Sequence, residues 1–502
     1  MNTQLNLSLD PISTGVPGLD NILGGGLTPQ RLYLVEGNPG AGKTTFAMQF
    51  LLEGAKQNEK GLYITLSETV SELQAVAASH GWNLDQIALY ELLDADGLDV
   101  DSEQSILYPS EIELGATTKG VMTLVEEITP MRVVFDSLSE MRLLAQNPLR
   151  YRRQILALKH FFATCKCTVM MLDDKTSDPG DLHLHSIAHG VISLEQTAQE
   201  FGGERRRLRV AKMRGIKFRG GYHDFNLETG GLQVFPRLVA AEHHRPFSDV
   251  VCSTGSRELD LLMGGGLTPG TNTLFIGPSG VGKTTTAVQC VLTALKRGQQ
   301  VAYYLFDEGL GTLLLRAASL GMDIRPYIEQ GSLVINQVDP AELSPGEFSY
   351  KVRNAVERDH ATVVVIDSLN AYLHAMPGEK FLLLQMHEML SYLSQQGITT
   401  LLILGQHGMV GEVRSEVDMS YLSDSIIMFR FFEVKGEILS AVSVVKSRTN
   451  NHERTIREFR LSSEKGLQVG QTLKDFEGIL AGLPTYYGPT RMLQERLELN
   501  GE

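Results

Sequence analysis

Two short stretches of this sequence, GNPGAGKTTF and GPSGVGKTTT, share the pattern Gly-x-x-x-x-Gly-Lys-Thr. Glycines let a backbone wrap closely around a phosphate, and the amides of a following helix N-terminus donate hydrogen bonds to it. The lysine of this pattern reaches the β- and γ-phosphates, and the threonine hydroxyl can bind Mg²⁺. The pattern predicts two sites for ATP and Mg²⁺. The expected nucleotide-binding residues are Gly37, Gly40, Ala41, Gly42, Lys43, Thr44 and Thr45 in the first copy, and Gly277, Gly280, Val281, Gly282, Lys283, Thr284 and Thr285 in the second.

Two aspartates are candidates for the other side of each magnesium site. Asp136 and Asp367 end the apolar runs VVFD and VVVID. A carboxylate at the end of such a strand can hold the Mg²⁺ shell beside the nucleotide, opposite Thr44 or Thr284. An aspartate there can also simply cap the next helix, but a neighbouring glycine-rich loop favours the metal role.

In each half a glutamate follows the first apolar run after the glycine-rich loop, before the aspartate. Glu68 ends GLYITLSE, and Glu308 ends VAYYLFDE. A carboxylate at this place can orient a water or another hydroxyl for attack on the γ-phosphate, although capping of a helix is the simpler alternative. The halves differ one residue earlier, where the first has Ser67 and the second has Asp307. We therefore expect Lys43 and Glu68 to be catalytic in the first half, and Lys283, Asp307 and Glu308 in the second.

The two halves are an internal repeat. Lys43 and Lys283 are 240 residues apart, and the same offset relates Glu68 to Glu308. Short Val/Ile/Leu-rich runs alternate with helix-length segments in each half, which predicts α/β domains with mainly parallel sheets covered on both faces. We expect a first domain over residues 1–245, a second over 246–470, and a tail over 471–502.

Composition excludes several classes of protein. The 502 residues include 42% hydrophobic residues and carry a formal net charge of -14, which is typical of a folded protein and argues against a nucleic-acid binder. There is no apolar run of about 18 residues, so we expect no membrane span and a cytoplasmic protein. The four cysteines are too few and scattered for a disulfide framework.

The motifs STG, GGGLTP and AKMRGIKFRGGY, together with the glycine-rich loops, resemble the KaiC family over nearly the whole chain. The resemblance implies two tandem RecA-like P-loop NTPase domains in a homohexamer. ATP would lie at subunit interfaces, where one subunit's loop binds it and a neighbour's cations complete the site. The family positions that contact nucleotide correspond to Ser79, Lys212, Met213 and Arg214 in the first half, and to Lys446, Ser447 and Arg448 in the second.

The resemblance also implies a second chemistry. In the family the first domain hydrolyses ATP slowly, and the second transfers phosphate to adjacent side chains and later removes it. The matching acceptors are Ser420 and Tyr421, where tyrosine replaces the usual threonine. A phenol oxygen lies further from the backbone than a hydroxymethyl oxygen, so Ser420 is the better acceptor. Asp307 and Glu308 would activate its hydroxyl and help to hold Mg²⁺.

The family also suggests partners and rival functions. FEGILAGLPT, ending at Thr485, resembles a regulatory C-terminal loop, and a KaiB-like partner would dock on the first domain. Two alternatives stay open: a RecA-type DNA-dependent ATPase, such as a recombinase or helicase, and an ATPase scaffold without kinase activity. The favoured interpretation is an ATPase and autokinase in a signalling or timing hexamer.

Overall fold

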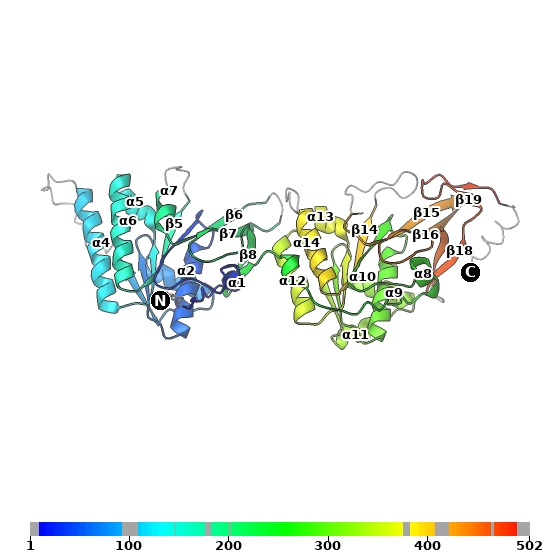
Figure 1. Ribbon diagram of the computed structural model, residues 1–502, viewed down its shortest axis with the longest axis horizontal. Helices are drawn as coiled ribbons and strands as arrows, with labels where there is room; N and C mark the ends of the chain where they lie inside the picture. The colour runs from blue at the N-terminus through cyan, green and yellow to red at the C-terminus, as the bar shows by residue number, and fades with distance from the viewer. Residues whose placement is uncertain are drawn as a thin grey trace, which may run out of the picture. The chain divides into compact units, whose positions relative to one another are not determined.

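The computed structural model describes residues 10–92, 109–145, 147–175, 182–199, 202–374, 382–406, 421–462 and 466–488. The chain divides into two compact units, Met1–Arg237 and Leu238–Glu502 (Figure 1).

In its described residues, the first unit contains a nine-stranded sheet in the order β3-β2-β4-β5-β1-β6-β7-β8-β9. The strands from β3 to β6 are parallel to their neighbours, and β6 to β9 form antiparallel pairs. The strands are β1 (Leu32–Gly37), β2 (Gly61–Thr65), β3 (Ile87–Glu91), β4 (Arg132–Asp136), β5 (Thr168–Asp174), β6 (Gly190–Thr197), β7 (Arg205–Met213), β8 (His223–Glu228) and β9 (Gly231–Phe235).

The second unit repeats this topology over its described residues, in the order β12-β11-β13-β14-β10-β15-β16-β17-β18. Its strands are β10 (Asn272–Gly277), β11 (Val301–Leu305), β12 (Leu333–Gln337), β13 (Val363–Asp367), β14 (Thr399–Gly405), β15 (Ser425–Val434), β16 (Glu437–Ser447), β17 (Arg457–Ser462) and β18 (Gly466–Thr472), with a further pair, β19 (Phe476–Glu477) and β20 (Thr485–Tyr486). The predicted α/β class with two mainly parallel sheets is confirmed.

Helices cover both faces of each sheet. In the first unit these are α1 (Leu19–Ile22), α2 (Lys43–Lys56), α3 (Val70–Ser79), α4 (Pro109–Ile128), α5 (Leu138–Ala145), α6 (Pro148–Thr164) and α7 (Leu182–Ile187). In the second they are α8 (Arg257–Met263), α9 (Lys283–Lys296), α10 (Leu310–Ser319), α11 (Arg325–Glu329), α12 (Pro345–Glu357), α13 (Leu369–His374) and α14 (Leu382–Gln395). Figure 1 shows α4, α5 and α6 side by side on one face of the first sheet, and they contact one another.

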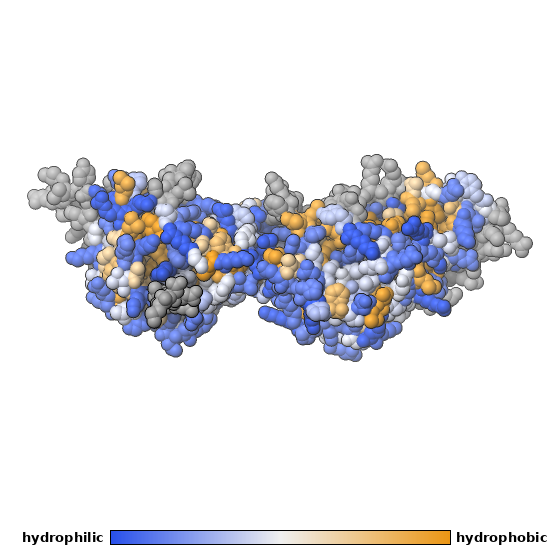
Figure 2. Space-filling model, in the orientation of Figure 1, coloured by the Kyte–Doolittle hydropathy of each residue, from blue (hydrophilic) through white to orange (hydrophobic). Residues whose placement is uncertain are grey.

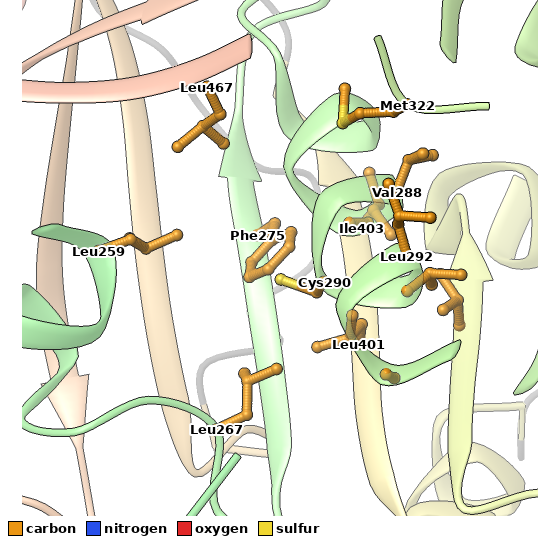
Figure 3. Close-up of a cluster of buried hydrophobic side chains, with 14 of the residues drawn as sticks. Leu259, Leu267, Phe275, Val288, Cys290, Leu292, Met322, Leu401, Ile403 and Leu467 are labelled. Atoms are coloured by element: carbon orange, nitrogen blue, oxygen red, sulfur yellow. The ribbon is translucent and has the colours of Figure 1, made fainter. Parts of the chain in front are cut away.

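Each sheet packs a separate apolar core on each face. Figure 3 shows one of these cores in the second unit, where Cys290 of α9 lies beside Phe275 of β10, while Val288 and Leu292 project from another side of the same helix. Phe275 is fully buried, and replacing such a phenylalanine with alanine costs about 3–5 kcal/mol. This packing fixes α9, and with it the glycine-rich loop that precedes the helix.

The connection between the units belongs structurally to the second one. Leu238 and Ala240 are buried in the core formed with α12, α13 and α14. The short 3₁₀ helix Ala240–Glu242 is held there because the Ala240 amide donates to Glu388 Oε2 over 3.2 Å. The second compact unit therefore begins at Leu238.

Candidate functional site

Each glycine-rich loop joins a buried strand to a helix N-terminus. Gly42 and Gly282 precede α2 and α9 with φ of 95° and 104°, a conformation that glycine adopts without strain. Lys43 and Lys283 begin these helices and are buried. Lys43 Nζ donates to the carbonyls of Gly37 and Asn38, and Lys283 Nζ donates to those of Gly277 and Pro278 at 2.8 and 2.7 Å. The loop carbonyls thus hold both ammonium groups at the N-terminus of their helix.

The two strand-ending aspartates lie beside these loops. Thr44 Oγ1 donates to Asp136 Oδ2 over 3.4 Å, and Thr284 makes the corresponding bond to Asp367. Burial raises the pKa of both carboxyl groups, partly opposed by hydrogen bonds from a tyrosine and from the threonine. A hydroxyl and a carboxylate side by side fit Mg²⁺, which keeps several waters and phosphate oxygens in its shell.

A buried tyrosine supports each aspartate, and the sequence analysis did not identify either one. The Tyr63 hydroxyl donates to Asp136 Oδ2 at 2.5 Å, and that of Tyr303 donates to Asp367 Oδ2 at 2.8 Å. The two tyrosines are 240 residues apart, which is the offset of the lysines, so the repeat contained the signal. Each phenol fixes the orientation of the carboxylate that would face the metal.

Glu68 faces the first site with one unpaired oxygen. Its Oε2 is buried and has no hydrogen-bond partner. Burial raises the pKa of Glu68, the charges of Asp136 and Glu72 add to this rise, and Lys43 opposes it. A half-buried carboxylate with a free oxygen and a raised pKa is suited to accept a proton from water.

In the second site, the carboxylates of Asp307 and Glu308 both accept hydrogen bonds from other side chains. Glu308 accepts two hydrogen bonds from the guanidinium of Arg316 on α10, at 2.8 and 2.7 Å. Asp307 accepts a short hydrogen bond from the Ser368 hydroxyl. The first half has Val76 at the position of Arg316, so this arginine pairing distinguishes the two sites.

A cavity of about 590 Å³ joins the parts of the second site. Its lining includes most of the loop residues predicted from the sequence and adds several that were not. The added residues are Ser279, Leu305, Arg316, Ser319, Leu320, Ser368, Ile403, Gly405 and Leu461. Ser319 is the repeat counterpart of Ser79, whose Oγ donates to the Val76 carbonyl at the end of α3.

The cations expected to act on a neighbour's nucleotide hold carbonyl groups of their own chain in this structure. Lys212 Nζ donates to the His185 and Ala188 carbonyls, and Arg214 donates to that of Ser186. Burial lowers the pKa of Lys212, as do the nearby charges of Arg214 and Lys159. Met213 lies between them in sequence, but it is buried in the first core.

The second half repeats this arrangement near the predicted acceptors. Lys446 Nζ donates to the Ser423 carbonyl over 2.7 Å, and Arg448 reaches Asp424 and the Tyr421 carbonyl at 3.4 and 3.5 Å. The Ser447 hydroxyl accepts from the Asn450 amide. Tyr421 is 52% exposed, whereas Ser420 lies outside the described residues.

Two classes of feature are absent from the described part of the chain. It contains no group of three or more His, Cys, Asp or Glu side chains arranged to hold a metal ion. It also contains no helix with both the length and the apolar character needed to cross a membrane.

The comparison with protein families decides the assignment. The family model described as "ATPase: KaiC" matches residues 12–239 and again residues 252–474. The chain belongs to the KaiC family of ATPases. The two matches coincide with the two sheets, and the family confirms the resemblance drawn from the STG and GGGLTP motifs.

Curated KaiC-family relatives cover nearly the full chain at low identity. The circadian clock oscillator protein KaiC of Parathermosynechococcus lividus is 27% identical over 488 residues, 94% of this chain and 87% of its own length. The circadian clock protein KaiC3 of Synechocystis sp. is 26% identical over 95% of both chains. The KaiC of Synechococcus elongatus is 27% identical over 96% of this chain and 93% of its own. This KaiC-family chain is therefore a double-domain ATPase that binds ATP.

Proposed function

We propose that the protein is a KaiC-like ATPase and autokinase that acts as a signalling or timing homohexamer in the cytoplasm. The first domain hydrolyses ATP with Mg²⁺. The second transfers the γ-phosphoryl group of ATP to the Ser420 hydroxyl, with Tyr421 as a secondary acceptor, and later removes it. In the transfer the acceptor oxygen bonds to phosphorus, ADP leaves, and the hydroxyl proton passes to the acidic pair Asp307 and Glu308.

The observation that carries this proposal is the difference between the acidic groups of the two sites. Glu68 keeps a buried, unpaired oxygen for water, whereas Arg316 and Ser368 occupy the carboxylates of Glu308 and Asp307. A carboxylate held by other side chains has fewer free lone pairs with which to orient a mobile water, whereas a remaining lone pair can still take the proton of a hydroxyl positioned beside it. This difference favours hydrolysis at the first site and transfer to a positioned hydroxyl at the second.

The placement of the cations supports nucleotide sites shared between subunits. Tyr421, Lys446 and Arg448 do not line the cavity at the second glycine-rich loop, although all three are described residues. Lys446 and Arg448 instead bond to the segment that begins with Tyr421. If acceptor and cations serve one nucleotide, that nucleotide belongs to another subunit, as in the proposed hexamer.

A DNA-dependent motor fits the described surface less well. The arginine-rich run ERRRLRV lies largely on β7, where its side chains have partners within the chain. Arg206 pairs with Glu204 over 2.7 Å, and Arg207 and Arg209 lie over the ring of Tyr222. These engaged arginines do not form the open basic platform that a single strand requires.

The C-terminal hairpin is the proposed point of regulation. Phe476 of β19 packs on Phe432 of β15 with ring centres 5.3 Å apart. Figure 2 shows apolar residues gathered near this end of the second unit, and Leu480 and Leu483 of the hairpin are exposed. A partner that binds this hairpin could withdraw it from β15, and a KaiB-like partner would bind the first domain.

Intact-mass and phosphopeptide analysis after incubation with Mg-ATP tests the proposal. Wild type is compared with Ser420→Ala, Tyr421→Phe and Glu308→Gln. Phosphate on Ser420 that disappears in Glu308→Gln supports the autokinase, and a hexameric mass in native mass spectrometry supports the assembly. Absence of phosphate in every variant while ATP is still hydrolysed would leave a double ATPase without kinase activity.

A further inference from the structure

Among the residues that the structure describes, the lysine of the first glycine-rich loop has an acidic partner that its counterpart lacks. Lys43 Nζ lies 2.8 Å from Asp174 Oδ1, in addition to its two bonds with loop carbonyls. Asp174 is the last residue of β5 and is in register with Gly37, the first glycine of the loop. An internal carboxylate thus contacts the ammonium group that is expected to bind phosphate.

Neighbouring groups fix the orientation of Asp174. The Ser139 hydroxyl lies 3.3 Å from Asp174 Oδ2, and the Asp174 amide donates to Ser139 Oγ over 3.1 Å. The same hydroxyl lies 3.1 Å from Oδ1 of the preceding residue, Asp173, which pairs with Arg142 over 2.6 Å and not with Lys43. The contact with Lys43 therefore depends on Asp174 itself, not on the general acidity of this strand end.

The second half builds the same junction without a carboxylate. Gly405 ends β14 in register with Gly277, so it occupies the place of Asp174. Asn370 replaces Ser139: its side chain donates to the Gly405 carbonyl and accepts from the Gly405 amide, at 3.0 and 2.6 Å. Burial lowers the pKa of Lys283 to about 8, with Asp367 opposing this effect. Lys283 therefore has no carboxylate, among the described residues of this junction, that would compete with the phosphates for its ammonium group.

This difference changes the cost of binding a nucleotide. A triphosphate must displace Asp174 from Lys43, and the carboxylate then remains near the phosphates as a like charge. Asp136 and Glu68 are two other acids at this site, since the charge of Lys43 opposes the rise in the pKa of both. We propose that Asp174 is an internal competitor for Lys43 that lowers the affinity of the first site for ATP and speeds nucleotide release.

The only tryptophan of the chain can report on this site. Trp82 packs against His80 with ring centres 4.8 Å apart. His80 Nε2 in turn lies 3.5 Å from Thr45 Oγ1, in the first turn of α2. Phosphate binding at the loop should therefore change Trp82 fluorescence, and Lys43→Ala should abolish that change. Trp82 belongs to the first unit, in which this loop lies.

Titration of the full chain with a non-hydrolysable ATP analogue and Mg²⁺, followed by Trp82 fluorescence, tests the inference. Asp174→Asn and Asp174→Gly, the latter copying Gly405, should lower Kd at least tenfold, about 1.4 kcal/mol, mainly through slower release. Asp173→Asn, which removes the same charge from the adjacent residue, should change Kd less than threefold. An unchanged or raised Kd in both Asp174 variants would overturn the proposal, because Asp174 would then be irrelevant or would help Lys43 to bind.

If the Asp174 variants fold poorly, the same inference can be tested by introducing the residues of the first junction into the second half. Gly405→Asp combined with Asn370→Ser copies the first junction, and the shorter serine relieves the 3.3 Å approach of a new Cβ to Asn370 Oδ1. Binding of the radiolabelled analogue to Lys43→Ala protein should weaken at least tenfold with this pair. Unweakened binding would contradict the inference. The inference rests on ATP binding alone, so failure of the autokinase assay would leave it standing.

Discussion

Arg316 holds Glu308 through a bidentate contact, with both guanidinium–carboxylate distances below 3 Å. Both partners are partly exposed, with side-chain exposures of 37% and 21%, so solvent weakens the pair. Its importance lies in geometry, because a carboxylate that accepts two arginine hydrogen bonds has fewer lone pairs left to orient a water.

Removing this arginine should increase hydrolysis at the second site. In a Lys43→Ala background, which silences the first site, we expect Arg316→Val to raise ATP turnover three- to tenfold, because Glu308 gains a free oxygen. Phosphate release is the measurement. The converse exchange, Val76→Arg in a Lys283→Ala background, should reduce turnover by pairing Glu68. Unchanged turnover in both variants would show that the pairing does not control water activation.

The raised pKa of Glu68 predicts that ATP turnover at the first site falls on the acid side of its pH profile. A proton-accepting carboxylate must be ionised, so turnover should fall as pH falls through the pKa of Glu68, at a midpoint above its ordinary value of 4.5. The pH profile of Lys283→Ala protein, which reports the first site alone, checks this. Glu68→Gln should lose at least tenfold in turnover and show no such fall, and a midpoint at or below 4.5 would contradict the prediction.

The lowered pKa of Lys283 predicts proton uptake when nucleotide binds the second site. Near pH 8 about half of the free lysine is neutral, and a bound triphosphate restores its charge. We expect uptake of up to about half a proton per nucleotide at pH 8 and little at pH 6.5. Calorimetric titration in buffers of different ionisation enthalpy measures this. The uptake should vanish in Lys283→Ala, and equal uptake at both pH values would exclude Lys283 as the source.

The two loop glycines should differ in their tolerance of alanine. At Gly282 a new Cβ would meet Leu461 Cδ1 at 2.7 Å, whereas at Gly42 the nearest atom is 3.6 Å away. Both positions have positive φ, so alanine costs about 1–2 kcal/mol at either one, but only Gly282→Ala adds a steric clash. The thermal transition of the full chain should therefore fall further for Gly282→Ala. A larger fall for Gly42→Ala would contradict this comparison.

The sequence predicted the local part of the sites and missed the part built by distant residues. Glycine-rich loops followed by lysine specify their own conformation, so they could be identified directly. The contact between Tyr63 and Asp136 joins residues on different strands, and Tyr63 looked like any other core aromatic. Arg316 likewise looked like an ordinary basic residue of a helix.

Lys212 and Arg214 show a different limit of sequence analysis. The family position of Lys212 and Arg214 suggested a role in a neighbour's site, but sequence patterns do not reveal what such side chains contact within their own chain. Here they bond to carbonyls near the end of α7, where cations are favoured by exposed carbonyl groups. These contacts within the chain could be found only from the three-dimensional packing.

The anchoring of Leu238 and Ala240 has a consequence for dividing the chain. A recombinant second half that starts at residue 246 would lose two buried side chains and the bond between the Ala240 amide and Glu388. It would expose the apolar surface that they cover and tend to self-associate. A second half that starts before Leu238 keeps both buried side chains and the bond to Glu388. The connecting peptide should therefore be included with the second domain whenever the two domains are expressed separately.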